Sequence, residues 1–455
     1  MVSSRPWSLL LLAFGCAASD GAEADATTSG SSSTASVSST ATTPASTDPD
    51  STADTSSSTT TTPAEDSSTG PMPCVTTEDC GTGDPLVAFC VDNACTNCGA
   101  TPNPNAACAS VYPAFPVCVG DECVRCTADN DSDCQGTTPV CDTVAQDCVA
   151  CSDNSECPDS ACDFEQGNCF PTSEVVYVDN TFTGCEQLGV GLPALPFCEI
   201  ADAASVIDEI GTIVIAGGTG YGQVTVDGKR VAIVGDYEVP PAIQNLSGPG
   251  LIVDGDAVVF VDGLRISNSD LWAVQLIEGQ LWLYRSQILN NSGSGGIEAH
   301  AKTTLRLRNS LVAETFGGDP GLAAIRLDGA HIVATFSTIT NNFGNFNEDG
   351  GSILCTAATG VIRNSIVTGI FADSIAGCGG VTFSNNAVDT AGLGTQVGAH
   401  DDAWFDSEYR LTQAGATVMA DIAQWVEGDP RFDIDGQPRQ MVVTSQPGWD
   451  QPDRL

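Results

Sequence analysis

The chain of 455 residues has very few basic residues. It contains 15 Lys and Arg against 58 Asp and Glu, which gives a formal net charge of −43. Between Pro6 and Gly228 the only basic residue is Arg125. Because so acidic a surface repels a phosphate backbone, we do not expect a nucleic-acid partner.

The chain also lacks a long hydrophobic run. Its most apolar stretch, residues 7–14, follows Arg5 and is followed by small residues. Eight apolar residues are too few to span about 30 Å of hydrocarbon, whereas they match the core of a secretory signal. No later stretch reaches about 18 apolar residues, so we expect an exported chain without a membrane span.

This apolar stretch ends in a cysteine, Cys16, which is separated from all the others. The motif Ala13-Phe14-Gly15-Cys16 resembles a bacterial lipobox, with Ala13 in place of the usual leucine. The resemblance implies that residues 1–16 form a lipoprotein signal peptide and that acylated Cys16 anchors the protein in membrane lipid. Ala17 after the cysteine implies the outer membrane of a Gram-negative cell. The alternative is an ordinary signal peptide, which would leave the protein secreted and unanchored.

Residues 17–73 contain no Lys, Arg, Cys or aromatic residue and consist mostly of Ser, Thr, Ala, Pro and Asp. Such a segment buries too little apolar surface to offset the entropy lost on ordering. We therefore predict a disordered Ser/Thr-rich stalk.

Residues 74–170 contain a fourfold cysteine repeat. Four units of four cysteines follow one another, and each junction is a Cys-x-x-Cys: Cys74, Cys80, Cys90, Cys95; Cys98, Cys108, Cys118, Cys123; Cys126, Cys134, Cys141, Cys148; Cys151, Cys157, Cys162, Cys169. Each unit is too small for an apolar core of its own, which favours two disulfides per unit with three connectivities open.

The alternative for these cysteines is zinc, because Cys95-x-x-Cys98 followed by Cys123-x-x-Cys126 loosely matches a four-cysteine site. That site would leave the intervening cysteines unused, and the region contains no histidine. We expect neither a metal nor a cofactor. The repeats resemble those of large myxobacterial lipoproteins, which implies a spacer or adhesive module.

Residues 174–455 contain β-branched runs between Gly, Asn, Asp and Ser turns. A short helix is expected from about Ile200. The final apolar positions of six similar phrases recur every 21 to 28 residues: Ile266, Ile288, Val312, Ile339, Val367 and Val388. This interval predicts one turn of a β-solenoid. Two residues further on, Asn268, Asn290 and Asn341 form a partial column that could bond successive bends.

The phrases "VYVDN…LPFCEIADAASVI", "NSLV", "STITNN", "RNSIV" and "EYRLTQAGA" resemble those of the pectate-lyase-like superfamily. The resemblance implies a mainly β fold, a right-handed parallel β-helix (a single-stranded solenoid) with an N-terminal capping helix and an irregular C-terminal segment. It also implies that a polysaccharide lyase or a glycoside hydrolase must be considered.

Catalysis on this fold would need several converging ionisable groups. The candidates are Asp254 with Asp256, and His400 with Asp401 and Asp402. The first pair lies beside Gly255 in a turn-like phrase, and the second group lies in the C-terminal segment beyond the regular coils. We therefore interpret the aspartates of both groups as turn residues and assign no catalytic residue.

A candidate binding surface comes from two phrases 24 residues apart, "LWLYRS" and "LRLRNS". If they align, their leucines point inward while Trp282 stacks on Arg306 and Tyr284 on Arg308 outside. Such a strip could bind a polysaccharide or a cell-envelope glycan. The alternative is a stacking ladder that only covers the sheet.

The 21 cysteines are an odd number. Cys185 and Cys198 can close a loop, and Cys355 and Cys378 lie one coil apart. With the four units these pairs account for 20 cysteines and leave Cys16, which favours the anchor. We therefore expect a surface lipoprotein that binds or adheres without catalysis, with an extracellular lyase or hydrolase as the alternative and a structural spacer as the third candidate.

Overall fold

The computed structural model describes residues 74–80, 89–185, 189–244, 247–317, 323–344, 351–371, 373–439 and 444–451. The expected signal peptide with Cys16 and the expected stalk, residues 17–73, lie outside these residues. Among the described residues, no helix combines the length and the apolar character needed to cross a bilayer.

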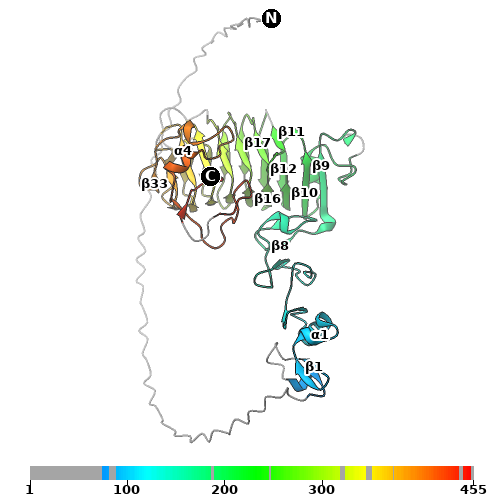
Figure 1. The fold of residues 1–455 in the computed structure, drawn as a ribbon. Coiled ribbons are helices and arrows are strands. Elements are labelled where there is room, and N and C mark those ends of the chain that lie inside the picture. The colour runs from blue at the N-terminus through cyan, green and yellow to red at the C-terminus, as the bar shows by residue number, and fades with distance from the viewer. Residues whose placement is uncertain are drawn as a thin grey trace, which may run out of the picture. The chain divides into compact units, whose positions relative to one another are not determined.

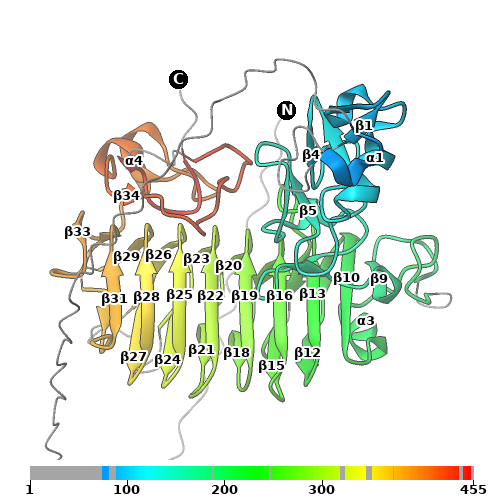
Figure 2. The same cartoon turned by 90° about the horizontal axis from the view of Figure 1, so that it is seen from below.

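The greater part of the described chain is a parallel β-helix, in which strands recur in groups of three and form three parallel sheets (Figure 1). Sheet 1 contains β9 (Val175–Asp179), β10 (Ile210–Gly217), β13 (Arg230–Val234), β16 (Val258–Asp262), β19 (Gln280–Tyr284), β22 (Thr304–Arg308), β25 (His331–Thr335), β28 (Thr359–Arg363) and β31 (Val381–Ser384). Figure 2 shows these strands following one another from β10 to β31. The mainly β solenoid expected from the sequence is confirmed.

The other two sheets complete each coil. Sheet 2 contains β11 (Thr219–Tyr221), β14 (Ala242–Gln244), β17 (Arg265–Ser267), β20 (Gln287–Leu289), β23 (Leu311–Ala313), β26 (Thr338–Asn342), β29 (Ile366–Gly369), β32 (Ala387–Val388) and β33 (Thr395–Gln396). Sheet 3 contains β12 (Val224–Asp227), β15 (Leu251–Asp254), β18 (Trp272–Leu276), β21 (Gly295–Ala299), β24 (Ile325–Asp328), β27 (Ile353–Thr356) and β30 (Ile375–Ala376).

The interior of the β-helix contains apolar columns that run from coil to coil. Sheet 2 pairs the six predicted positions directly, from Ile266 with Ile288 to Val367 with Val388, and all six are buried. The four leucines of β19 and β22 are buried in the same way. β-branched and leucine side chains therefore stack on their own counterparts one coil away, which explains the interval read from the sequence.

Polar ladders stabilise the corners of the coils. Between sheets 1 and 2, the buried hydroxyls of Ser310, Ser337 and Ser365 each accept a hydrogen bond from the serine N–H one coil earlier. At the next corner, the Asn290 side chain donates to Asn268 at 3.3 Å, as the asparagine column predicts. Asn341 instead donates to the Tyr409 hydroxyl, because the C-terminal segment packs beside it.

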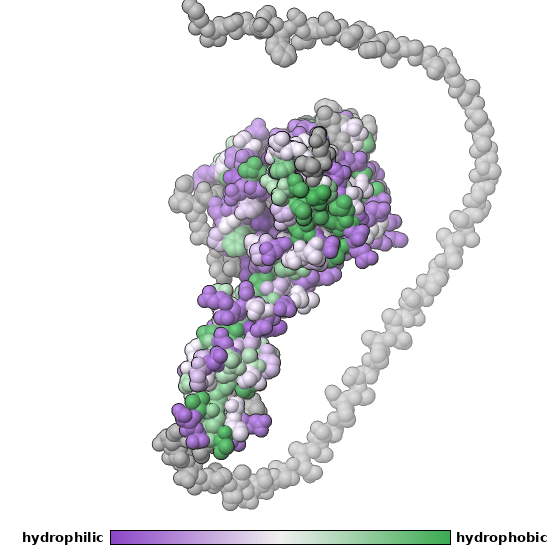
Figure 3. All heavy atoms as spheres, turned by 90° about the vertical axis from the view of Figure 1, so that its right-hand side faces the viewer, coloured by the Kyte–Doolittle hydropathy of each residue, from purple (hydrophilic) through white to green (hydrophobic). Residues whose placement is uncertain are grey.

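A helix packs at the first coil of the β-helix, and the C-terminal segment packs on outward residues of sheet 2. The helix α3 (Ile200–Val206) packs against β9, β10 and β12, where the sequence places a capping helix. Figure 3 looks onto this end, where apolar side chains gather; Val190, Leu192 and Val206 are exposed. At the other end follow η5 (Asp402–Trp404), α4 (Gln413–Val418), β34 (Ala423–Gln424) and β35 (Thr444–Ser445).

This C-terminal segment returns along the β-helix and is fixed by Arg439. The Arg439 guanidinium is buried over the Phe336 ring at 4.1 Å and donates to Asn309 Oδ1 at 2.8 Å. Burial lowers the pKa of Arg439 to about 10. The Trp449 indole, also buried, donates to the Tyr409 carbonyl at 2.8 Å.

In the N-terminal region each of the four cysteine units contains a short hairpin. The strands are β1 (Phe89–Val91) and β2 (Ala94–Thr96), β3 (Val117–Val119) and β4 (Glu122–Val124), β5 (Val140–Asp142) and β6 (Asp147–Val149), and β7 (Cys162–Asp163) and β8 (Asn168–Cys169). A helix, α1 (Pro104–Val111), precedes β3 in the second unit.

The disulfide connectivity is the same in all four units: the first cysteine bonds to the third and the second to the fourth. The pairs are Cys74–Cys90 and Cys80–Cys95, Cys98–Cys118 and Cys108–Cys123, Cys126–Cys141 and Cys134–Cys148, and Cys151–Cys162 and Cys157–Cys169. Cys185–Cys198 and Cys355–Cys378 are also disulfides, as their positions suggest. No thiolate therefore remains in the four units to ligate zinc.

Replacing the buried Asn342 by alanine should destabilise the β-helix. Asn342 accepts from the Thr315 N–H at 3.0 Å and donates to the Val312 carbonyl at 2.9 Å, so Asn342→Ala leaves a buried amide without a partner. We expect a loss of about 2 kcal/mol in the free energy of unfolding, measured with denaturant. Gln244→Ala, on the exposed end of β14, is the control, and equal losses in both variants would contradict this role.

Candidate functional site

The outer face of sheet 1 is the place where the predicted strip lies. β19 and β22 pair in the predicted register, Trp282 with Arg306 and Tyr284 with Arg308. The Arg306 guanidinium lies 4.4 Å from the Trp282 ring centre and that of Arg308 5.3 Å from the Tyr284 ring centre. The predicted cation–π stacking is therefore present in both pairs.

The strip is not an open surface, because the fourth cysteine unit covers its aromatic half. Phe164 of this unit contacts the Trp282 ring at 6.1 Å and the Tyr284 ring at 5.5 Å, and Tyr284 is only 4% exposed. Phe170 packs on Phe260 of β16 in the same layer. The apolar outer face of β13, β16 and β19 is thus a second, smaller core.

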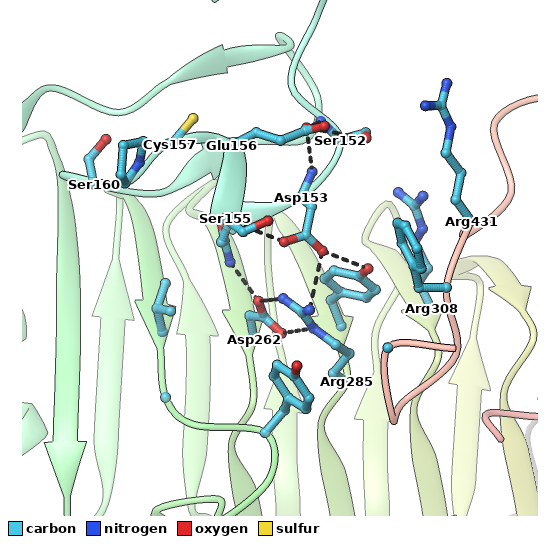
Figure 4. A pocket seen from close by; sticks show the side chains of 18 of the residues that line it. Ser152, Asp153, Ser155, Glu156, Cys157, Ser160, Asp262, Arg285, Arg308 and Arg431 are labelled. Carbon is cyan, nitrogen blue, oxygen red and sulfur yellow. Dashed lines mark hydrogen bonds and ion pairs between the residues drawn. The ribbon is translucent and has the colours of Figure 1, made fainter. Parts of the chain in front are cut away.

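Arg285 connects the fourth unit to the β-helix. Its guanidinium pairs with Asp262 at the end of β16 and with Asp153 of the fourth unit, the latter at 3.2 Å. The rings of Tyr237 and Tyr284 lie at 4.5 and 4.4 Å from the same guanidinium. Figure 4 shows this network of Asp153, Arg285 and Asp262.

Burial and the charge of Arg285 have opposite effects on the pKa of each carboxylate in this network. Burial raises the pKa of Asp262, and the Arg285 charge opposes that shift. Burial also acts on Asp153, but there the Arg285 charge and the Ser155 N–H bond outweigh it and lower the pKa. Asn154 donates to Asp262 at 2.7 Å, and the Tyr284 hydroxyl donates to Asp153 at 3.0 Å.

A second ion pair fixes the far side of the fourth unit. Arg230 of β13 pairs with the buried Asp163 and, at 2.9 Å, with Glu165. Its guanidinium also lies over the Phe260 ring, 5.2 Å from the centre. The fourth unit is therefore bound to sheet 1 by two arginines and a layer of aromatic rings.

The docked unit forms one wall of a cavity of about 760 Å³. The wall consists of residues 152–158 with Ser160; the floor includes Val234, Asp262, Tyr284 and Arg308; and the C-terminal segment contributes Arg431, Phe432 and Gly436. A volume of this size is typical of small-ligand sites.

The carboxylates of this cavity are already bound. Asp153 and Asp262 hold Arg285, while Glu156 accepts from the N–H groups of Ser152 and Asp153 at 2.6 and 3.0 Å. By contrast, Arg308 and Arg431 have no ion pair within the described part of the chain, and Figure 4 draws no bond from either. The cavity therefore offers guanidinium donors rather than an acid–base pair.

The other ionisable group considered from the sequence, His400 with Asp401 and Asp402, lines a cavity of about 490 Å³. His400 Nδ1 is 2.8 Å from the Thr340 hydroxyl and Nε2 is 3.1 Å from Asp402. Thr340 is fully buried and bonds to Thr368, so its hydroxyl does not face a substrate. Asp401 caps η5 by accepting from the Ala403 N–H, which is a turn role.

The sequence reasoning missed the cavity because its residues come from three separate segments. One local signal was available: the fourth unit alone carries the aromatic and acidic phrase "DFEQGNCF", which provides Asp163, Phe164, Glu165 and Phe170. In the other pair considered, Asp254 is the last residue of β15 and accepts from the Gly255 N–H, and Asp256 lies in the turn that follows.

A family model described as "Family of unknown function (DUF8331)" matches residues 58–175, the part of the chain that holds the four cysteine units. No curated protein and no solved structure matches the chain. The fold and the cavity thus describe a disulfide-rich parallel β-helix protein, and its function must be argued from the site.

Removing Arg285 should destabilise the packing of the fourth unit on the β-helix. Arg285→Gln leaves the buried Asp262 carboxyl without its cation, and we expect a loss of about 3–5 kcal/mol in the free energy of unfolding. The double variant Arg285→Gln, Asp262→Asn should recover most of that loss.

Arg326→Gln is the matched control, because Arg326 pairs with Glu298 at 3.6 Å on a more exposed surface. Its loss should stay below about 1 kcal/mol. Denaturant unfolding under oxidising conditions measures all three variants, and an Arg285→Gln chain as stable as the control would refute the role of the network.

Proposed function

We propose that this protein is an exported lipoprotein, anchored through Cys16 at a Gram-negative cell surface, whose β-helix binds a polysaccharide or cell-envelope glycan without cleaving it. The observation that carries the binding proposal is the state of the cavity: all three carboxylates named in it are held in bonds, while Arg308 and Arg431 are unpaired within the described residues. Such a site is suited to binding rather than to acid–base chemistry.

The disulfides support export. Ten disulfides join the cysteines of the described chain, and such a density is stable only in an oxidising compartment. A lyase or a hydrolase would need a carboxylate or a cation free to exchange protons with a bound sugar, and Arg285 between two carboxylates is not one.

The glycan proposal is tested with residues 17–455 on a glycan array, followed by incubation of each bound glycan with the protein. We expect binding and intact glycan chains. Residues 17–173, without the β-helix, are the control and should not bind. Shortened or unsaturated products would show the alternative enzyme, and the absence of any bound glycan would favour the structural spacer.

The anchor proposal is tested by expressing the full chain in a Gram-negative host and determining the mature N-terminus by mass spectrometry. We expect an acylated Cys16 as the first residue and recovery of the protein with the membrane fraction. Cys16→Ser should release the protein in soluble form. A mature chain that begins elsewhere, or that carries a free thiol at Cys16, would contradict the anchor.

A further inference from the structure

We propose that the cavity beneath the fourth cysteine unit is a binding site for a doubly charged oxyanion, a phosphate group, held between Arg308 and Arg431. That a sugar carries this oxyanion rests on the proposed function, whereas the oxyanion site itself does not.

Unpaired arginines are unexpected in a chain with 58 acidic and 15 basic residues. Six of the eleven described arginines are in ion pairs: Arg125, Arg230, Arg285, Arg326, Arg363 and Arg410. Three others have neutral partners, since Arg265 donates to Gln287, Arg306 lies over the Trp282 ring and Arg439 donates to Asn309. Arg308 and Arg431 line the same cavity and have no such partner within the described ranges. Arg431 also acts on Asp142 of the third unit, whose pKa is lowered by the Ala145 and Val144 N–H bonds and, less strongly, by this charge. Because neither Arg308 nor Arg431 is in a direct ion pair within the described residues, both guanidinium groups are available to an oxyanion from solution.

Arg308 also has an unsatisfied donor. Its Nε–H is buried and has no hydrogen-bond partner among the described residues, and an unsatisfied buried donor costs about 1–3 kcal/mol. The neighbouring Arg306 has a buried Nε without a partner as well. Because this Nε has almost no accessible surface, an oxyanion in the cavity would accept from the terminal Nη groups of Arg308 instead.

The carboxylates of the cavity do not compete for these arginines. Asp153 and Asp262 are held by Arg285, and Glu156 closes the capping box of η3 (Asn154–Glu156). Figure 4 shows this network on one side of the cavity and Arg308 and Arg431 on the other. Arg308 and Arg431 thus lie apart from the carboxylates that Arg285 holds within the same cavity.

The number of arginines indicates the charge of the ligand. Each guanidinium presents a planar fork of donors that fits a carboxylate or a phosphate. A phosphate monoester carries a charge of about −1.5 to −2 at neutral pH, which two guanidinium groups balance. A sugar monophosphate also fits the volume of about 760 Å³.

The site requires three parts of the chain at once. Arg308 comes from β22 of the β-helix, Arg431 from the C-terminal segment, and residues 152–158 from the fourth unit close the cavity. Arg431 is itself exposed, so its replacement should not disturb the fold.

The test is isothermal titration of residues 17–455 with glucose 6-phosphate, glucuronate, glucose, inorganic phosphate and inorganic sulfate. We expect glucose 6-phosphate to bind at least about tenfold more tightly than glucuronate, and glucose not to bind. Arg431→Gln and Arg308→Gln should each weaken glucose 6-phosphate binding at least about tenfold. Arg326→Gln removes the same charge elsewhere and should leave the affinity unchanged.

If Arg308→Gln does not fold, Arg308→Lys, which keeps the charge, replaces it in the affinity measurement. The inference is overturned if neither glucose 6-phosphate nor inorganic phosphate binds, or if binding is the same in Arg431→Gln as in Arg326→Gln. Arginine-dependent binding of phosphate without any bound glycan would support this site and refute the proposed function. If a neutral glycan binds with the same affinity to the protein and to both arginine variants, the proposed function is supported and this site is refuted.

Discussion

The mostly buried charge of Arg285, whose side chain is 13% exposed, is the interaction on which the rest of the site depends. A guanidinium between two tyrosine rings needs its carboxylates, because a buried charge without a partner is costly. One carboxylate, Asp262, comes from the β-helix and the other, Asp153, from the fourth cysteine unit. The charge is therefore balanced fully only when the two parts are in contact.

This contact also covers aromatic side chains on the outer face of sheet 1. A β-helix can bury its inward side chains by itself, whereas Phe260 and Trp282 point outward from β16 and β19. The fourth unit covers them with Phe164 and Phe170. A unit stapled by only two disulfides has no apolar core of its own, so the same layer of rings stabilises both partners. The cavity is a consequence of this docking rather than of the solenoid alone.

Much of the fold follows from the sequence because its contacts repeat. The column from Ile266 to Val388, the inward leucines and the stacking of Trp282 on Arg306 all depend on a period that can be counted. The capping helix near Ile200 is expected instead from its own phrase and the family resemblance. The disulfide connectivity could not be read from spacing, since each unit allows three pairings. The structure selects one pairing and repeats it four times.

The site was not predictable in the same way, because its contacts are singular and distant in sequence. Asn154 bonds to Asp262 across 108 residues, Tyr284 to Asp153 across 131, and Arg439 to Asn309 across 130. A sequence repeat does not predict such pairs. The strip of Trp282, Tyr284, Arg306 and Arg308 was placed correctly within the sheet, but its aromatic half is buried because another part of the chain needs the same surface.

Hydrogen exchange of the intact oxidised protein tests most directly whether the fourth unit is built onto the β-helix. The first three units are internal controls, because they share its connectivity. The account predicts that amides of the fourth unit, such as that of Cys162, which bonds to Asn154, exchange as slowly as those of β16 and β19. Exchange of the fourth unit at the rates of the first three would contradict it.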